Sequence, residues 1–316
     1  MKGLNLAALL ALGCSTPVGG TTVEPFLQDS LEDHIAVRDL SIRSDGRELY
    51  FSSQSFFGEI SSILYMVRDE DGGWSDPQMA AFSGDYNDLE PFLSPDGLRL
   101  YFASNRPRED GQAGDYDIWY VERDDFDGAW SPPVNMGQPV NSEANEFYPA
   151  ITAGEEFFFT SDREGSLGKD DIFHYSADGD EPLPLGKAVN SDGYEFNAFV
   201  APDGSFLIYT AYNREGGYGS GDLYISHRQE DGSWGESLNL GPEINSPRMD
   251  YCPFVDANGT LYFTSKRIAF SEAPYGFRET EAFLDAAGQY ANGQSRLYRM
   301  KEFESTTQQE QKGNNQ

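Results

Sequence analysis

Four acidic residues stand at equivalent positions along the chain and are its strongest candidates for binding chemistry. They are Asp88, Glu146, Glu195 and Asp250, which lie three residues before Pro91, Pro149, Ala198 and Pro253. If these positions open strands around a common axis, the carboxylates would converge on one mouth of that axis. They could then hold a cation such as calcium, or a basic peptide segment. Val37 at the matching position of the first copy would interrupt the ring. The alternative is that each carboxylate accepts hydrogen bonds from backbone amides of a neighbouring linker.

A second recurring pattern combines arginine with aspartate. The matching pairs are Arg106 with Asp117, Arg163 with Asp171, and Arg214 with Asp222. A guanidinium group that bonds a carboxylate can fix the geometry of a hairpin, and a residue that recurs in every structural unit is expected to serve that unit. We therefore predict structural ion pairs within each repeat rather than a catalytic site.

Other reactive side chains are few and scattered. His34, His174 and His227 have no nucleophile or metal-ligating partner beside them in the sequence. Cys252 is expected to be a small buried apolar residue. The sequence contains no phosphate-binding glycine loop, no cysteine–histidine metal cluster and no nucleophile elbow. We therefore predict no catalytic residue and no cofactor, with calcium at the acidic positions as the one exception.

The elements that would position these residues repeat five times, at a period of about 50–57 residues. Each copy opens with a turn and an aromatic strand: SDGRELYFSS, SPDGLRLYFAS, TAGEEFFFTS, APDGSFLIYTA and DANGTLYFTS. A third strand such as DIW, DIF or DLY follows, and then an Asp-Gly turn, which is a strong hairpin signal. Four short strands per repeat predict an all-β chain folded as a five-bladed β-propeller of four-stranded antiparallel blades. A six-bladed ring is the alternative.

The repeats occupy residues 37–303, and other segments flank or interrupt them. The fifth copy lacks a fourth strand, which Thr21–Leu27 is predicted to supply as a ring-closing strand within a tether of residues 15–36. Ile268–Gly293 is an insertion in which Phe277–Tyr290 has apolar residues near helical spacing, so a short surface helix is expected. Residues 304–316 are polar and are expected to be disordered.

The first 14 residues have the pattern of an export signal. Lys2 precedes the apolar run Leu4–Leu12, which is too short to span a bilayer. The tetrapeptide ALGC that ends at Cys14 resembles the lipobox of bacterial lipoproteins, which implies a lipid-modified Cys14 and attachment to a membrane. Ser15 then favours the periplasmic face of the outer membrane, with a secreted or soluble periplasmic protein as the alternative.

The charge of the chain narrows the class of its partners. It carries 53 acidic and 22 basic residues and a formal net charge of −31. A surface this negative repels phosphate backbones. Nucleic acid is therefore not a predicted partner.

Taken together, the Ser-Pro-Asp-Gly turn, the aromatic strand, Ser-x-Arg and Asp-Ile-Trp resemble the WD40-like Pro-Asp repeats of TolB-type propellers. The linker Gly-x-x-Val-Asn-Ser resembles the version found in bacterial envelope proteins. The resemblance spans roughly residues 37–303. It implies a non-enzymatic envelope scaffold that binds an envelope protein or peptide at the propeller mouth. Two alternatives stay open: a glycosidase-like enzyme that uses axial carboxylates such as Glu146 and Glu195, and a sensor of a cation or small ligand.

Overall fold

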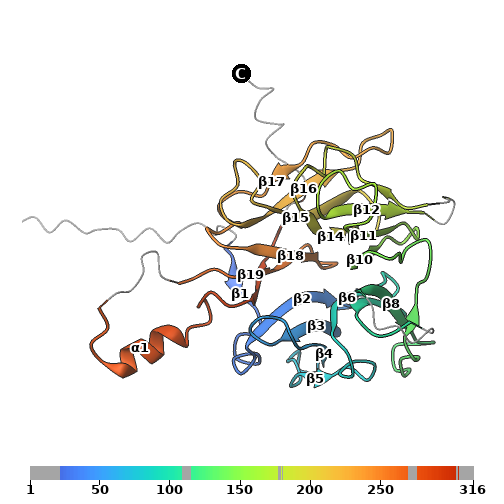
Figure 1. Ribbon diagram of the computed structural model, residues 1–316. Coiled ribbons are helices and arrows are strands. Elements are labelled where there is room, and N and C mark those ends of the chain that lie inside the picture. Colours follow the sequence, from blue (N-terminus) through green and yellow to red (C-terminus); the bar gives the residue numbers. More distant parts are fainter. Residues whose placement is uncertain are drawn as a thin grey trace, which may run out of the picture.

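The chain folds into a ring of five β-sheets, each with four antiparallel strands (Figure 1). This computed structural model describes residues 22–108, 115–176, 179, 181–269, 276–303 and 305. The innermost strand of each sheet contacts the innermost strand of the next, and the fifth contacts the first, so the ring is closed. The prediction of a five-bladed propeller is confirmed, and the six-bladed alternative is wrong. The predicted signal peptide with Cys14 lies outside the described residues, as does almost all of the predicted tail.

The blades follow one another in chain order. The first blade consists of β2 (Ala36–Ile42), β3 (Glu48–Gln54), β4 (Ser61–Val67) and β5 (Gln78–Met79). The second consists of β6 (Asp88–Leu93), β7 (Arg99–Ser104), β8 (Asp117–Glu122) and β9 (Val134–Asn135). The third consists of β10 (Glu146–Ile151), β11 (Phe157–Ser161), β12 (Asp171–Tyr175) and β13 (Leu183–Pro184). The fourth consists of β14 (Glu195–Val200), β15 (Phe206–Tyr212), β16 (Gly221–His227) and β17 (Leu238–Asn239). The fifth consists of β18 (Asp250–Val255), β19 (Leu261–Ser265), β20 (Arg296–Met300) and β1 (Glu24–Pro25).

The second strand of a blade is apolar on both faces, and this explains why the blades form a ring. In β7, Leu100 and Phe102 are fully buried and belong to a cluster shared with the first blade. Tyr101 points to the opposite face, where its ring lies 5.2 Å from that of Phe157 in the third blade. A sheet with two apolar faces must be covered on both sides, and stacking between two neighbours achieves this.

The ring is closed by a strand from the N-terminal segment. β1 pairs antiparallel with β20 and becomes the outermost strand of the fifth blade, within the segment predicted to do so. The buried ring of Phe26 lies 4.9 Å from that of Tyr262. The Tyr290 hydroxyl also donates a hydrogen bond to the backbone oxygen of Phe26 at 3.0 Å. The first and last repeats are thereby joined by backbone pairing and by packing.

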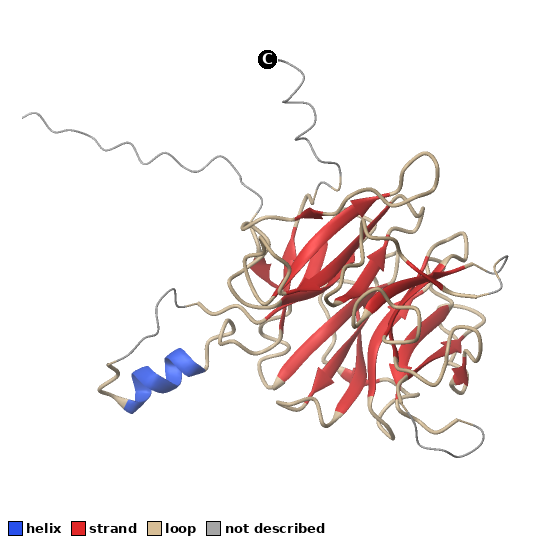
Figure 2. Cartoon of the chain, turned by 45° about the horizontal axis from the view of Figure 1, so that its top comes forward, coloured by secondary structure: helices blue, strands red, loops and turns tan. Residues whose placement is uncertain are grey.

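The insertion in the fifth blade contains the single described helix, α1 (Thr280–Ala287). This helix lies within the segment predicted to be helical. None of its residues is buried, and it stands away from the body of the propeller (Figure 2). Among the described residues, no helix has the length and apolar character needed to cross a membrane.

Candidate binding site on the propeller axis

The four predicted carboxylates do not line the axis but are enclosed within their own blades. Asp88, Glu146, Glu195 and Asp250 are 0%, 0%, 1% and 0% exposed. At Glu146, Oε2 accepts a hydrogen bond from the backbone N–H of Ser142 at 3.0 Å, and Oε1 accepts one from the Ser142 hydroxyl at 2.6 Å. Ser191 and Ser246 serve Glu195 and Asp250 in the same way. The predicted axial rim is therefore wrong. Glu146, Glu195 and Asp250 fasten the linker to the first strand through its backbone amides, as the alternative predicted. Asp88 instead accepts a hydrogen bond from the Ser83 hydroxyl at 2.8 Å.

The predicted partners of the repeated arginines are also wrong. Each arginine contacts the carboxylate that opens the first strand, at distances of 2.6 Å for Arg106–Asp88, 2.8 Å for Arg163–Glu146 and 2.9 Å for Arg214–Glu195. The reason is the register: Asp88 lies opposite Ser104, and an arginine two residues beyond Ser104 reaches back to that carboxylate.

The repeated aspartates that open the third strands, Asp117, Asp171 and Asp222, have other roles. The Asp222 carboxylate accepts hydrogen bonds from the backbone N–H groups of Tyr218 and Gly219 at 2.6 and 2.9 Å. Asp171 does the same with Leu167 and Gly168. Asp117 instead forms an ion pair with Arg108 at 2.6 Å. These aspartates therefore stabilise the hairpin that precedes the third strand.

Five other residues line the axis, one from each innermost strand. They are Asp39, Glu90, Tyr148, Asn197 and Cys252, and they surround a central cavity of about 40 Å³. Each lies where the register of the innermost strand shifts against its neighbour. Each also has a left-handed backbone, with φ values of 59°, 63°, 51°, 57° and 51°. Such a conformation is uncommon for non-glycine residues, and here a β-bulge turns one side chain per blade towards the axis.

Arg38, which precedes Asp39 in β2, places its guanidinium group among these residues. Its nitrogens lie 2.8 Å from the Asp39 carboxylate, 3.3 Å from Glu90 Oε1 and 2.5 Å from the Tyr148 hydroxyl. The guanidinium also lies over the rings of Tyr148 and Tyr251, 5.4 and 5.1 Å from their centroids. Because the Arg38 side chain is only 13% exposed, the axial carboxylates already have a cation supplied by the chain itself.

The axial carboxyl of Glu90 has a pKa above its ordinary value. Burial raises the pKa of Glu90 to about 8, against the opposing effect of Arg38 and with a further rise from Asp39. Its Oε2 accepts a hydrogen bond from the backbone N–H of Tyr148 at 2.7 Å. The Asp39 carboxylate contacts the Arg38 guanidinium group at 2.8 Å.

Cys252 is a polar member of the ring rather than the plain apolar residue that was predicted. Its thiol donates a hydrogen bond to Asp39 Oδ1 at 2.6 Å, and Asn197 Nδ2 donates one to its sulfur at 3.3 Å. Burial raises the pKa of the thiol well above its ordinary value. Because a thiolate is the reactive form of cysteine, this thiol is a structural donor and not a nucleophile.

Glu90→Gln is expected to flatten the pH dependence of stability. Between the ordinary carboxyl pKa of 4.5 and the folded value of about 8, the folded protein retains a proton that the unfolded chain has lost. Glu90 therefore makes the free energy of unfolding fall as pH rises through this window, and the variant lacks this contribution. Glutamine keeps an acceptor for Tyr148 and stays neutral beside Arg38 and Asp39. Thermal unfolding should show a higher melting temperature for the variant at pH 8.5 and similar values at pH 5. Parallel curves for the two proteins would contradict the assignment.

The axis is closed on one side of the ring by aromatic side chains and opens beyond them into an apolar bowl. The Phe199 ring lies 6.4 Å from that of Phe92 and 5.4 Å from that of Phe254. The bowl has a volume of about 550 Å³ and lies where the innermost strands end and turn into the second strands. Every blade contributes an apolar side chain to its wall: Ile42, Phe92, Ile151, Phe199 and Phe254. The large concave surface on the axis is therefore apolar.

No protein-family model and no curated protein sequence matches the chain. Among solved structures, it is similar to the catalytic domain of a GH62 α-L-arabinofuranosidase from Coprinopsis cinerea, with 13% identity, a TM-score of 0.52, and coverage of 89% of this chain and 95% of that one. An α-L-arabinofuranosidase from Podospora anserina in complex with cellotriose matches with 15% identity, a TM-score of 0.52, and coverage of 89% and 94%. TolB from Acinetobacter baumannii matches with 15% identity, a TM-score of 0.47, and coverage of 84% of this chain and 55% of TolB. At these identities the two arabinofuranosidases show a shared propeller fold and nothing about activity.

The axial residues were missed although the sequence carries a signal for them. They lie two positions after Val37 and after each of the four predicted carboxylates, and in the aligned repeats this position holds Asp, Glu, Tyr, Asn and Cys. A position that changes type from blade to blade is not required by the blade. Arg38 is a further departure, because the matching residues of the other repeats are Leu89, Phe147, Phe196 and Tyr251.

Proposed function

We propose that this protein is a non-enzymatic binding propeller whose apolar bowl receives apolar side chains of a protein or peptide partner. The observation that carries the proposal is the contribution of an apolar side chain to the bowl by every blade. Concave apolar surfaces of this size are the usual form of a binding site. The bowl lies at the mouth of the propeller where the innermost strands end. The predicted binding mouth was the opposite one, where these strands begin.

The alternative of a glycosidase with axial carboxylates receives less support. Such enzymes use two carboxyl groups that flank the scissile bond at about 5–10 Å from each other. Here Asp39 and Glu90 both contact Arg38, and the cavity beside them is about 40 Å³. Pockets that hold small ligands measure roughly 300–1,000 Å³. The predicted candidates Glu146 and Glu195 are each held by an arginine.

The location of the protein is part of the same proposal. A periplasmic or outer-membrane propeller with a lipid at Cys14 would present the bowl to other envelope proteins. Both parts rest on the export signal and the ALGC tetrapeptide. Incorporation of labelled palmitate into wild type but not into Cys14→Ala would support the anchor, and equal labelling of both would contradict it.

The proposed binding is tested with fluorescent octapeptides. Their outer positions are Gly and Ser, and their two central positions are both Leu, both Phe or both Ser. Fluorescence anisotropy should show saturable binding of the apolar peptides and none of the all-polar peptide. Val255→Asp adds a charge to the bowl wall and Ala257→Arg adds one at its exposed edge. Both should weaken binding at least tenfold. Leu183→Asp, on the outer strand β13 where Leu183 is 67% exposed, is the matched control and should bind as wild type does. Equal binding of apolar and polar peptides would overturn the proposal, as would unchanged binding by folded bowl variants.

A further inference from the structure

Among the described residues, two of the five interfaces between blades, the first and the third, are fastened by an ion pair that we call the clasp. At the first interface the Arg123 guanidinium, from the residue after β8, lies 2.7 Å from Glu48 of the first blade. At the third interface Arg228, the residue after β16, lies 2.5 Å from Glu156 of the third blade. Aligned repeats place these residues at the same two positions. The clasp therefore joins an arginine of one blade to a glutamate of the blade before it.

A turn glycine lies against each clasp and leaves room for it. A Cβ atom on Gly97 would lie 3.0 Å from the side chain of Arg43, which also pairs with Glu48. A Cβ atom on Gly204 would lie 3.1 Å from Arg228 and 3.3 Å from Glu156. Both glycines have positive φ values of 71° and 70°. The clasp and the glycine thus form one repeated arrangement.

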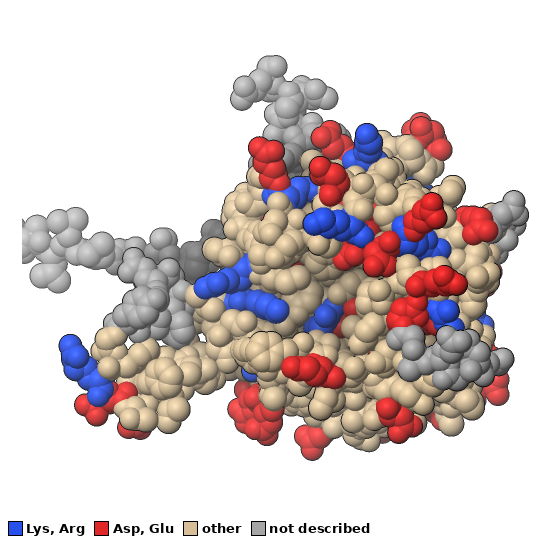
Figure 3. Space-filling model, in the orientation of Figure 1, with Lys and Arg blue, Asp and Glu red and all other residues tan. Residues whose placement is uncertain are grey.

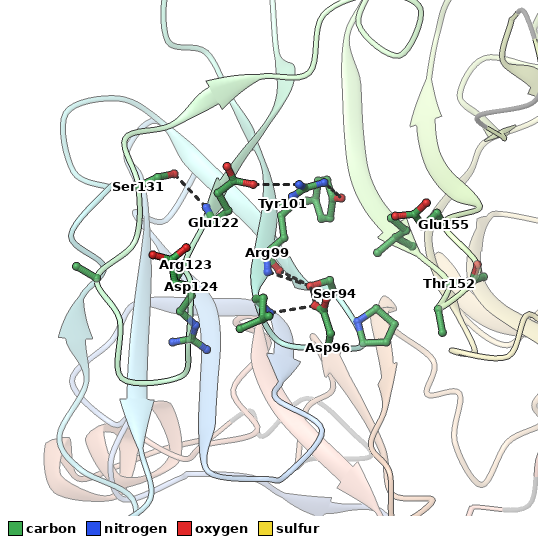
Figure 4. Close-up of a pocket in the computed structure, with 15 residues that line it drawn as sticks. Ser94, Asp96, Arg99, Tyr101, Glu122, Arg123, Asp124, Ser131, Thr152 and Glu155 are labelled. Carbon is green, nitrogen blue, oxygen red and sulfur yellow. Dashed lines mark hydrogen bonds and ion pairs between the residues drawn. The ribbon is translucent and has the colours of Figure 1, made fainter.

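The interface between the second and third blades lacks the clasp, as do the fourth and fifth interfaces, where Phe206 and Thr260 stand at the glutamate position. It alone also lacks the turn glycine. Arg99 stands where the clasp has glutamate, and Ala177 stands where it has arginine. Glu155 takes the turn position with positive φ that Gly97 and Gly204 hold at the clasps. Among the described residues, the ion pair of Arg99 is with Glu122 of its own blade, at 3.0 Å. A cleft of about 640 Å³ is found at this interface, and Arg99 and Glu155 lie on its opposite walls (Figure 4).

The cleft carries an excess of negative charge. It is lined by four carboxylates and two guanidinium groups: Asp96, Glu122, Asp124, Glu155, Arg99 and Arg123. Arg123 is bound to Glu48 and Arg99 to Glu122. Asp124 and Glu155 have no ion pair with any described residue. The face seen in Figure 3 also has acidic side chains spread out to its edges, and the chain as a whole is strongly negative. Such a cleft attracts a cationic group.

The cleft and the bowl are continuous. Ser94, Pro95 and Ile151 line both of them. A segment with an apolar side chain in the bowl therefore has a direct path outwards past Glu155. At this position every other blade has glycine, whereas Glu155 adopts a φ of 63°. A non-glycine residue in this conformation adds strain.

We propose that this cleft binds a lysine or arginine side chain of the segment whose apolar side chain occupies the bowl. The inference rests on the proposed function and adds the chemistry of the partner: an extended segment with a basic residue beside apolar ones. The negative charge of the cleft favours a basic side chain. Because the cleft shares a wall with the bowl, this side chain is expected to lie close in sequence to the apolar one.

The test compares three octapeptides that share one apolar centre and carry flanking Lys, Ser or Glu. For wild type we expect the Lys peptide to bind most tightly, the Ser peptide less tightly and the Glu peptide most weakly. Salt should reduce the difference in affinity between the Lys and Glu peptides. Glu155→Gln and Glu155→Gly should each weaken the Lys peptide about 2–5-fold, the range of an exposed ion pair, and leave the Ser peptide unchanged. Arg99→Gln should strengthen the Lys peptide, because it removes a positive charge from the cleft.

Two measurements separate this role from a structural one. Glu155→Gly restores the glycine of the other blades, so it should raise the melting temperature while it weakens Lys-peptide binding. Glu230→Gln removes an exposed carboxylate outside the cleft and should change neither quantity. Binding of the Ser peptide without any preference for Lys would overturn this inference and leave the bowl intact. Loss of all peptide binding would overturn the proposed function itself.

Discussion

Replacing Glu48 by glutamine is expected to lower the free energy of unfolding by about 3–5 kcal/mol, the usual cost of removing one partner from a buried ion pair. The Glu48 carboxylate lies 2.9 Å from Arg43 and 2.7 Å from Arg123, and accepts a hydrogen bond from the Tyr50 hydroxyl at 2.6 Å. The Glu48 side chain is 9% exposed and that of Arg123 is 2% exposed. The variant would leave the buried Arg123 guanidinium without a carboxylate at the interface of the first two blades, whereas Arg43 would keep its ion pair with Asp45 at 2.8 Å.

The matched control is Glu156→Gln at the third interface, which breaks the same clasp in a wetter setting. The Glu156 and Arg228 side chains are 27% and 26% exposed, so water can replace the lost partner. We expect a loss of about 0–1 kcal/mol there. Urea unfolding, monitored by tryptophan fluorescence, gives the free energy of unfolding of both variants. A loss at Glu48 as small as that at Glu156 would show that burial does not set the strength of the clasp.

The blades could be predicted because their signals are local. Turn residues, alternating aromatic strands and the Asp-Gly corners each involve residues close in sequence, and their repetition fixes the number of blades. The closing strand was also predictable, because the fifth repeat visibly lacks its fourth strand. In the structure that strand is β1, paired with β20.

The candidate site was predicted less well because it depends on a local irregularity and on long-range partners. The bulge after Asp88 decides that Glu90, and not Asp88, faces the axis. A regular strand would present both residues on the same side, and the sequence pattern does not show where the backbone departs from regularity. The partner of each arginine depends on which carboxylate lies opposite it in the paired strands. Whether a clasp or a cleft forms depends on the residues that two neighbouring blades bring together. Comparison of the aligned repeats reveals part of the site, since Arg38 stands where the other repeats have the apolar or aromatic residues Leu89, Phe147, Phe196 and Tyr251.

Gly219→Ala is expected to destabilise the fold by about 3 kcal/mol or more, because the added methyl group would overlap the backbone of the next linker. An ideal Cβ at Gly219 would lie 1.8 Å from the backbone oxygen of Arg248 and 2.6 Å from that of Ser246. The hairpin cannot easily move away. Its N–H at Gly219 is bound by Asp222, and Gly221 forms a parallel bridge with Met249.

Two further glycines make this a graded series. Gly168 has the same position in the third blade, where a Cβ would lie 2.5 Å from the Gly193 oxygen and 2.7 Å from that of Ser191. Gly168→Ala should therefore cost less than Gly219→Ala. Gly186 has no atom within 4 Å of its Cβ position, so Gly186→Ala should stay within about 0.5 kcal/mol of wild type. Chemical denaturation of the three variants gives the order directly. If Gly219→Ala were as stable as Gly186→Ala, the hairpin would not be packed closely against the linker.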